Sequence, residues 1–497
     1  MRYVMAIHQY QLFIDGKWQN PSSNEWIDSI NPFTNKVWSR VPRANKDDVN
    51  KVCQAASKAF PQWSKMHPNQ RAALLRKLAD KLTQNSAYLA EIEVNDNGKI
   101  IAEMSAQMKY LPQYFYYYAG LADTVMGNTI TVDKPHHIAY TEYEPLGVVV
   151  AITAWNSPLM QVAWKIAPAL AVGNTVVIKP SEFTSSSAFE LAKMAEEVGF
   201  PPGVINVISG FGSEIGSALI THPEVAKVAF TGGTATGAAI YSEAAKYLKK
   251  VSLELGGKSP NIVFDDANID NAVKGVISGI FAASGQTCIA GSRLVLQESI
   301  HDEFVAKLVD FAKQAKMGNP MNINTQIGPV TTSQQYERIL SYIDIAKNEG
   351  AKCVIGGKPA SGKECEDSPW FVEPTIFTDV TNDMRIAQEE VFGPVLSVIK
   401  FKDVKNAIDI ANDIQFGLAA GIWTQDIKKA LQLPKEIKAG TIWVNTYRAV
   451  SYLVPFGGYK QSGLGRENGQ NAIYDYLQIK STFIGTEETT ENPFILK

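Results

Sequence analysis

From Leu146 onward, short runs of β-branched residues alternate with segments that have the spacing of amphipathic helices. Runs such as GVVVAIT (147–153) and NTVVIKP (174–180) are separated by segments such as PLMQVAWKIAPALAVG (158–173) and SSSAFELAKMAEEVG (185–199). Continuous Val and Ile runs are typical of strands buried on both faces, and the helices between them supply the crossovers of a parallel sheet. The pattern predicts a doubly wound α/β unit of the Rossmann-like type.

The same alternation resumes with different loops near Pro260. The strand-like NIVF (261–264) and RLVL (293–296) alternate with the helix-like NIDNAVKGVISGIFAA (268–283) and HDEFVAKLVDFAKQAK (301–316). A chain of 497 residues is long enough for about two to four domains. We therefore expect a second α/β domain, with a cleft between the two.

The remaining segments predict other structure. The first 120 residues read mostly as helices, for example from Lys46 to Trp63 and from Asn69 to Asn95. Residues 128–144 alternate polar and β-branched residues as a hairpin-like ribbon would, and QIKSTFI (478–484) is another expected strand. A ribbon without a core of its own pairs either across subunits or as an edge hairpin of the same chain, and the sequence leaves both readings open.

Composition excludes several classes of protein. The net charge is −3 and the basic residues are scattered, so there is no footprint for a nucleic-acid backbone. The apolar run from Leu146 to Ala154 is far shorter than the roughly 20 residues of a membrane helix, and the N-terminus lacks the pattern of a secretory signal, so we expect a cytoplasmic protein. Four widely spaced cysteines without a C-x-x-C pair predict neither a disulfide framework nor a metal site.

Two residues suggest chemistry. Cys288, in FAASGQTCIAGSR, follows a helical stretch and is surrounded by small residues that would leave a thiolate accessible. None of the six histidines forms a recognisable Cys/His signature, so a carboxylate is the better candidate for a base. Glu254, between a β-rich run and a Gly-Gly turn, fits that role if burial raises its pKa. Without their neighbours, Cys288 would read as an inert core thiol and Glu254 as a solvated edge residue.

Seven motifs in a fixed order supply that context. They are AWNSPL (154–159), KPSE (179–182), FTGGTATG (230–237), ELGGKSP (254–260), GQTC (285–288), EEVFGP (389–394) and PFGGYKQSG (455–463). Each alone is weak, but together they resemble the motif set of the aldehyde dehydrogenase superfamily, in its non-acylating, NAD(P)-dependent branch. The similarity runs from FIDGKW at Phe13 to the C-terminal strand.

The resemblance implies an enzyme that oxidises an aldehyde to a carboxylic acid. It gives Cys288 the role of the nucleophile that forms a thiohemiacetal and then a thioester. The side-chain amide of Asn156 and the backbone N–H of Cys288 would hold the oxyanion. Glu254 would activate Cys288 or the water that hydrolyses the thioester.

The resemblance also implies a nicotinamide cofactor. Lys179 and Glu182 follow a predicted strand, where ligand groups are expected in an open α/β sheet. A carboxylate at Glu182 would repel a 2′-phosphate, so we expect NAD, with NADP possible. Neither glycine-rich segment has the G-x-G-x-x-G spacing, a departure that the family shares. The further cofactor-binding residues implied are Trp155, Gly212, Gly232, Gly233, Glu390 and Phe392.

The residues expected to line the aldehyde tunnel are mixed in character: Tyr110, Met160, Gln161, Trp164, Arg448, Tyr452 and Phe456. A guanidinium at Arg448 would favour a polar or carboxylate-bearing aldehyde, such as a semialdehyde, although a solvated surface arginine is the simpler interpretation. Betaine aldehyde competes, because Trp164, Tyr110 and Tyr452 could form an aromatic cage for a cation.

The implied architecture has three parts. Residues 1–122 and 146–256 would form the cofactor-binding domain, residues 257–465 the catalytic domain, and residues 123–145 and 466–497 a small β ribbon for oligomerisation. A homodimer or homotetramer is expected. One alternative is a CoA-acylating aldehyde dehydrogenase, which Glu254 disfavours. Another is a catalytically silent NAD-binding structural protein, which would have no reason to retain Cys288, Glu254, Asn156 and Lys179 together. A third is a cysteine hydrolase or acyl transferase, which would bind no nicotinamide cofactor.

Overall fold

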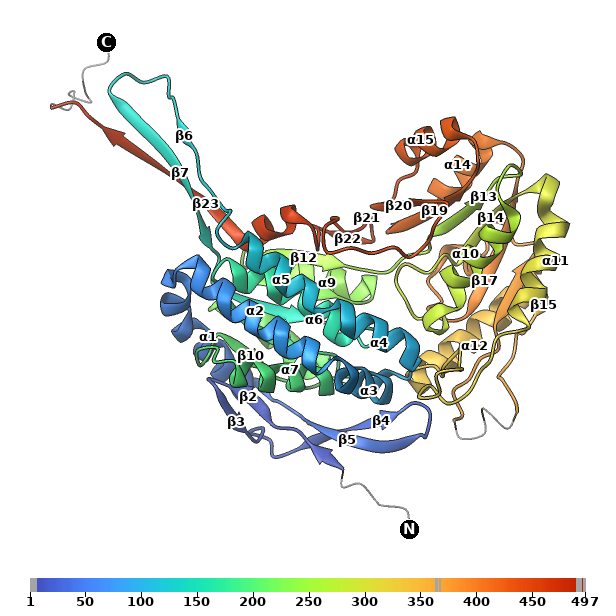
Figure 1. Cartoon of the computed structure of the whole chain (residues 1–497), viewed down its shortest axis with the longest axis horizontal. Helices are drawn as coiled ribbons and strands as arrows, with labels where there is room; N and C mark the ends of the chain where they lie inside the picture. Colours follow the sequence, from blue (N-terminus) through green and yellow to red (C-terminus); the bar gives the residue numbers. More distant parts are fainter. Residues whose placement is uncertain (1–6, 363–364, 366–367, 489–493, 495–497) are drawn as a thin grey trace.

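The computed structural model describes residues 7–362, 365, 368–488 and 494, and its two large sheets stand in separate halves of the molecule (Figure 1). Residues 1–6 of the predicted cofactor-binding segment 1–122 lie outside the described residues. So do residues 489–493 and 495–497 of the predicted oligomerisation segment 466–497. The first sheet has eight strands in the order β22-β12-β11-β8-β9-β10-β2-β3. Its five central strands are parallel: β12 (Lys250–Glu254), β11 (Val225–Thr231), β8 (Val148–Ile152), β9 (Thr175–Lys179) and β10 (Ile205–Val207).

This strand order confirms the predicted doubly wound unit. The chain runs outward from β8 through β9 to β10 and then returns to place β11 on the other side of β8. Ligands bind outside the carboxyl ends of the strands at such a reversal. The residues that follow β8 and β11, from Thr153 to Asn156 and at Gly232 and Gly233, therefore meet at the expected crevice.

Helices cover both faces of the first sheet (Figure 1). The apolar residues of one face pack against α2 (Pro68–Gln84), α5 (Pro112–Leu121), α6 (Pro158–Ala171) and α7 (Ser186–Glu197). The other face packs against α1 (Lys46–Lys65), α8 (Gly212–Thr221) and α9 (Thr234–Ala245). The helices thus bury the Val and Ile side chains of the strands from both sides, as the continuous runs predicted.

The N-terminal region confirms the helices and adds strands that the sequence reading missed. Helix α1 covers the first predicted segment, and the second divides at Asn85 into α2 and α3 (Ser86–Asn97), followed by α4 (Ile101–Tyr110). Before them lie short strands that were not predicted, namely β1 (His8–Gln9), β2 (Leu12–Ile14), β3 (Lys17–Gln19), β4 (Trp26–Asn31) and β5 (Lys36–Pro42).

The second sheet has seven strands in the order β15-β16-β17-β14-β13-β19-β20. Six are parallel, namely β16 (Thr375–Thr378), β17 (Val395–Phe401), β14 (Arg293–Gln297), β13 (Pro260–Val263), β19 (Ala419–Trp423) and β20 (Thr441–Val444), and β15 (Lys352–Ile355) is antiparallel. The helices around it are α10 (Ile269–Phe281), α11 (His301–Ala312), α12 (Ser333–Asn348), α13 (Arg385–Gln388), α14 (Val404–Asn412) and α15 (Ile427–Glu436). A second α/β unit beginning at Pro260 is confirmed.

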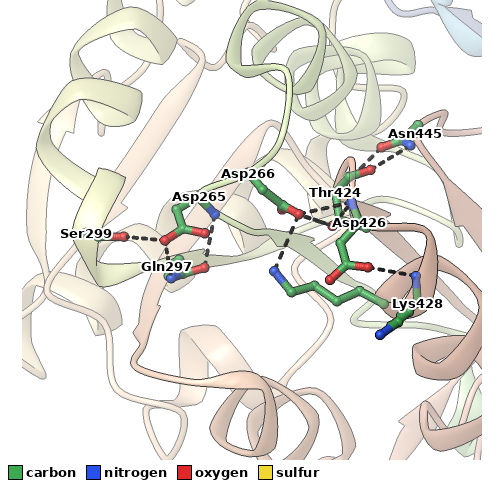
Figure 2. Close-up of polar contacts among 9 residues, drawn as sticks. Asp265, Asp266, Gln297, Ser299, Thr424, Asp426, Lys428 and Asn445 are labelled. Atoms are coloured by element: carbon green, nitrogen blue, oxygen red, sulfur yellow. Dashed lines mark hydrogen bonds and ion pairs between the residues drawn. The ribbon is translucent and has the colours of Figure 1, made fainter.

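Polar contacts occupy the carboxyl ends of β13 and β19 in the second sheet (Figure 2). Asp266 accepts hydrogen bonds from the Thr424 hydroxyl at 2.8 and 2.9 Å and from the Asp426 N–H at 3.0 Å. Asp265 accepts a hydrogen bond from the Gln297 amide at 2.7 Å.

The opposite end of this sheet faces the first domain. The segment that joins the two sheets, residues 255–259, enters β13 at its amino end. The second domain therefore meets the crevice of the first through the amino end of its sheet.

A three-stranded ribbon projects from the body of the molecule (Figure 1). It consists of β6 (Thr129–Ile130), β7 (His137–Pro145) and β23 (Leu477–Gly485), and β23 pairs antiparallel with β7 along its whole length. This confirms the predicted ribbon and C-terminal strand, and it shows that they pair within one chain. Across the described residues, no helix is both long and apolar enough to cross a membrane.

Candidate active site

A single cavity of about 1100 Å³ brings together most of the residues predicted from the motifs. Its walls include all three expected catalytic residues, Cys288, Glu254 and Asn156. They also include every expected cofactor residue: Trp155, Lys179, Glu182, Gly212, Gly232, Gly233, Glu390 and Phe392. The lining residues come from both α/β halves, so the cavity lies where the two domains face each other.

A turn of left-handed residues delivers Cys288 to this cavity. Helix α10 ends at Phe281, and Ala283, Ser284 and Gly285 follow with φ values of 53°, 52° and 70°. A Cβ atom on Gly285 would lie 2.0 Å from the carbonyl oxygen of Gly393, so only glycine fits there. The cysteine consequently lies in a loop beyond the helix that the sequence predicted.

Glu254 is the last residue of β12 and is 5% exposed. Neither of its carboxylate oxygens has a hydrogen-bond partner in the structure. Burial raises the pKa of Glu254 well above its usual range, and the nearby Glu467 carboxylate adds to the rise. The predicted buried carboxylate with a raised pKa is thus present.

The Cys288 thiol and the Glu254 carboxyl influence each other. Burial raises the pKa of Cys288 to about 12, and the charges of Glu254 and Glu390 contribute to the increase. Two anions at this depth repel, so ionisation of one group suppresses ionisation of the other. The pair therefore holds one negative charge more easily than two, an arrangement in which a proton can pass from the Cys288 thiol to the Glu254 carboxylate.

Buried polar residues missed by the sequence reading surround Glu254. The Lys165 ammonium forms an ion pair with Glu467 and donates a hydrogen bond to the Thr231 hydroxyl at 2.6 Å. The Lys165 charge lowers the pKa of Glu254, whereas Glu467 raises it. The sequence could have indicated this cluster through Lys165, because a lysine within the apolar helix α6 is rarely buried without a partner.

Asn156 is held by two hydrogen bonds. Its Nδ2 donates to the Gln286 carbonyl at 3.0 Å, and its Oδ1 accepts from Gln161 Nε2 at 2.8 Å. An amide nitrogen has two hydrogens, so the second remains for a substrate oxygen. Gln161, expected to contact substrate, also lines the cavity, but its amide is engaged in orienting Asn156 and in accepting the Ala154 N–H at 2.8 Å.

The cofactor side of the cavity holds a cation, a carboxylate and two helix N-termini. Lys179, the last residue of β9, lies 3.5 Å from the Glu182 carboxylate. Burial lowers the pKa of Lys179, and Glu182 opposes that effect. Helices α8 and α9 begin at Gly212 and Thr234 on the cavity wall, where free N–H groups favour an anion.

The EEVFGP segment closes the opposite wall. The Gly257 N–H donates to Glu390 Oε1 at 3.0 Å, and burial raises the pKa of Glu390 to about 7. The Phe392 ring meets the Trp155 ring edge-on, with centroids 5.2 Å apart.

Helix α12 contributes cavity residues that the sequence reading missed. Gln335 donates to the carbonyl oxygens of Val391 and Phe392 at 2.9 and 3.0 Å, and Arg338 donates to that of Glu390 at 3.1 Å. Both side chains also line the cavity. The sequence gives no sign of their role, because no local motif marks the polar face of this helix.

Most of the predicted tunnel residues form an aromatic cluster outside the main cavity. The Tyr110 and Tyr452 rings are 5.7 Å apart, and the Trp164 and Phe456 rings are 5.3 Å apart. Tyr114 joins the two pairs, with ring centroids 6.1 Å from Trp164 and 6.0 Å from Tyr452. These rings pack against one another, and Met160 is buried in the same core.

Arg448 has protein partners. Its Nη1 lies 3.7 Å from the Glu103 carboxylate and donates to the Ser278 carbonyl at 3.3 Å. About a fifth of each of the two side chains is exposed. Arg448 is thus neither a free surface residue nor an unpaired charge.

Comparisons with known proteins agree with this site. The model of the aldehyde dehydrogenase family matches residues 18–482. A dehydrogenase of Acinetobacter baylyi that acts on (Z)-2-((N-methylformamido)methylene)-5-hydroxybutyrolactone is 44% identical over 495 residues, which cover 99% of this chain and 100% of that protein. An aldehyde dehydrogenase of Aspergillus niger is 47% identical over 472 residues, covering 95% and 94%.

A solved structure agrees as well. A crystal structure of betaine aldehyde dehydrogenase from Staphylococcus aureus with NAD+ superposes with a TM-score of 0.96 at 41% identity, covering 97% of this chain and 96% of that one. The fold and its similarity to an NAD+ complex define the class of NAD-binding oxidoreductases. The chain belongs to the aldehyde dehydrogenase family, whose members oxidise aldehydes.

Proposed function

We propose that this protein oxidises an aldehyde to a carboxylic acid with NAD, through a thioester on Cys288 that water resolves. The observation that carries the proposal is the convergence of Cys288, Glu254 and Asn156 on one cavity with the cofactor residues. Cys288 Sγ adds to the aldehyde carbon, and its proton passes to Glu254. The oxyanion accepts hydrogen bonds from Asn156 Nδ2 and the Cys288 N–H.

The remaining steps complete the oxidation. Bound NAD supplies the acceptor for the hydride that leaves the former aldehyde carbon. Glu254 first releases to solvent the proton it took from Cys288. It then takes a proton from water, whose oxygen attacks the thioester carbon; the C–S bond breaks, and the departing Cys288 sulfur accepts that proton from Glu254. The products are the acid, a reduced cofactor and the regenerated thiol. A buried carboxylate without hydrogen-bond partners supports hydrolysis over transfer to CoA, because it has the raised pKa that a base for water needs.

The cavity suits NAD. Glu182 would accept hydrogen bonds from the adenosine ribose, Lys179 would hold the same sugar, and the N-termini of α8 and α9 would face the pyrophosphate. The Glu182 carboxylate would repel a 2′-phosphate, which supports NAD over NADP. Glu390 and Phe392 would hold the nicotinamide half, with Trp155, Gly232 and Gly233 completing the walls.

For the substrate we propose a polar or carboxylate-bearing aldehyde. Arg448, which forms an ion pair with Glu103, and the buried Lys99 place two cations near Cys288, and this supports a substrate that carries an anionic group. A quaternary ammonium aldehyde is the second candidate, since rings such as Trp164, Tyr110 and Tyr452 stand nearby. The Arg448→Ala variant tests the first candidate. It should lower kcat/KM for acidic aldehydes and change kcat/KM for neutral aldehydes by no more than about twofold.

We further propose that residues 1–122 and 146–256 are the cofactor domain, residues 257–465 the catalytic domain, and residues 123–145 and 466–497 the oligomerisation segments of a homodimer or homotetramer. The separate ribbon, with its exposed Ile138, Ile479 and Phe483, supports the last assignment. A cytoplasmic location is supported by the need to keep the Cys288 thiol reduced.

One assay tests the function. Purified protein is mixed with NAD or NADP and a panel of acidic, neutral and cationic aldehydes, and the absorbance of the reduced cofactor is recorded with and without CoA. We expect reduction of NAD that is independent of CoA and is abolished by Cys288→Ser. Full activity of the Cys288→Ser variant, or activity that requires CoA, would refute the proposal.

A further inference from the structure

Lys99 is a buried cation beside the proposed catalytic residues, and none of the chemical steps above involves it. It lies in the short connection between α3 and α4 and is 4% exposed. Its ammonium donates a hydrogen bond to Ser157 Oγ at 2.8 Å. Ser157 directly follows Asn156 and is the N-cap residue of α6. Lys99 therefore holds the residue next to the proposed oxyanion amide.

Glu103 contacts the other half of the oxyanion site. It lies in the first turn of α4, four residues after Lys99, and its Oε1 accepts the Ala283 N–H at 3.0 Å. Ala283 begins the turn that leads to Cys288, and both it and Ser284 are left-handed. Non-glycine residues adopt that conformation only when their surroundings hold them there. Glu103 supplies such a contact.

We propose that Lys99 and Glu103 are positioning residues that fix the two oxyanion donors relative to each other: Lys99 orients Asn156 through Ser157, and Glu103 orients Cys288 through Ala283. Both lie on one short stretch of chain, so the Asn156 turn and the Cys288 turn share one support. The inference rests on the proposed roles of Asn156 and Cys288. It adds residues that none of the seven motifs contains.

Charge gives this arrangement a second effect. The Lys99 ammonium lowers the pKa of the Cys288 thiol, against the effects of burial, Glu254 and Glu390. Four groups act on Lys99 in turn: the Glu103 and Glu93 carboxylates, the Cys288 thiol and the Arg448 guanidinium. Burial lowers the pKa of Lys99 to about 8, so it is mainly charged at neutral pH. Loss of this charge raises the pKa of Cys288 and moves thiolate formation to higher pH.

The test compares three lysine variants of the whole enzyme. Lys99→Met should lower kcat by about tenfold to a hundredfold, because small displacements of reacting groups have effects of that size. Iodoacetamide should alkylate its Cys288 only at higher pH than in the wild type. Lys99→Arg should recover part of both losses. Lys109→Met, the same change at an exposed position of α4, should match the wild type.

Two further variants separate contact from charge. Ser157→Ala removes the acceptor and keeps the ammonium, so kcat should fall while the pH profile of alkylation stays in place. Glu103→Gln keeps an acceptor for the Ala283 N–H, so it should retain more activity than Glu103→Ala. The melting temperature and the dissociation constant for NAD are measured for each variant, so that a loss of folding is recognised.

The proposal fails if Lys99→Met, with a normal melting temperature, keeps wild-type kcat and the wild-type alkylation profile. It also fails if Lys99→Arg recovers neither property. If Lys99→Met does not fold, Ser157→Ala and the Glu103 pair decide: a wild-type kcat in Ser157→Ala, or equal activity of the two Glu103 variants, overturns it. Failure of the proposed function is recognised separately, because it appears as full activity in Cys288→Ser.

Discussion

At the scale of residues, the proposed chemistry depends on two buried acids. Burial raises the pKa of both Cys288 and Glu254, and the Glu254 charge raises that of Cys288 further. Both groups are acids with raised pKa values, so a rising pH ionises them and a falling pH protonates them. Thiolate formation, and with it the rate of Cys288 alkylation, should therefore increase from neutral to alkaline pH.

The Glu254→Gln variant tests the effect of the Glu254 charge on the pKa of Cys288. The glutamate charge raises the pKa of Cys288, so its removal lowers that pKa. The pH midpoint of alkylation by iodoacetamide should move downward, whereas steady-state turnover should fall by at least about a hundredfold, the usual contribution of a general base. A midpoint that is unchanged or moves upward contradicts the described coupling.

At the same scale, we propose that Glu182 sets the preference for NAD over NADP. Glu182→Gln removes the charge that would repel a 2′-phosphate and keeps a hydrogen-bonding group in the cavity. We expect the ratio of kcat/KM for NAD to that for NADP to fall by about tenfold, which corresponds to roughly 1.4 kcal/mol. The Lys193→Gln variant, altered at an exposed position of α7, serves as the control. An unchanged ratio contradicts the role of Glu182.

The sequence identified the residues of the cavity that lie in local motifs, including Cys288, Glu254 and Lys179. It could not identify Lys99, Glu103, Gln335 or Arg338, because their roles arise from contacts between segments distant in the chain. Gln161 shows the same limit. The sequence predicted it as a tunnel residue, but its hydrogen bond to Asn156 depends on the geometry of α6.

At the scale of elements, the turn from Ala283 to Gly285 fixes the position of Cys288, the proposed nucleophile. A Gly285→Ala side chain would have both an unfavourable φ of 70° and a Cβ within 2.0 Å of the Gly393 oxygen. We expect a loss of about 2–4 kcal/mol in the free energy of unfolding and a severe loss of kcat. Urea denaturation and steady-state kinetics measure both.

The matched control is Gly199→Ala. Gly199 has a φ of +90° but no atom within 4 Å of an added Cβ, so the variant isolates the backbone effect. It should lose only about 1 kcal/mol and keep its kcat. Equal losses in the two variants would show that contact with Gly393 is unimportant.

The alternation of strands and helices predicted the central elements of both sheets, because buried parallel strands carry continuous apolar runs. Strands β1 to β5 were missed because they have only two to seven residues, and all of them except the three-residue β2 are partly exposed. One signal was present: Asp15-Gly16, between β2 and β3, has positive φ values at both residues, as a tight hairpin turn requires.

At the scale of the whole molecule, the ribbon of β6, β7 and β23 lies apart from the main body (Figure 1). Ile479 and Phe483 are 57% and 62% exposed on one face of β23. The sequence predicted the ribbon but not whether it pairs across subunits or within the chain, because a single sequence carries no direct record of contacts with a second subunit. Exposed apolar side chains on an edge strand favour association.

Replacement of both residues tests this use of the ribbon. The double variant Ile479→Asp/Phe483→Asp should shift the protein to a smaller species in size-exclusion chromatography with light scattering, because buried charges oppose an apolar interface. Gln478→Asp, on the opposite face of the same strand, should leave the assembly unchanged. An unaltered mass for the double variant would refute the role of the ribbon in oligomerisation.

The central claim is that a thioester on Cys288 is resolved by water that Glu254 activates. The most direct measurement is rapid-quench mass spectrometry of Glu254→Gln mixed with NAD and an aldehyde substrate at alkaline pH, where Cys288 loses its proton to solvent and acylation does not need Glu254. We expect one acyl group per active site on the peptide that contains Cys288, together with a burst of reduced cofactor of equal size and slow turnover. Absence of the adduct, or an adduct on another residue, would contradict the account.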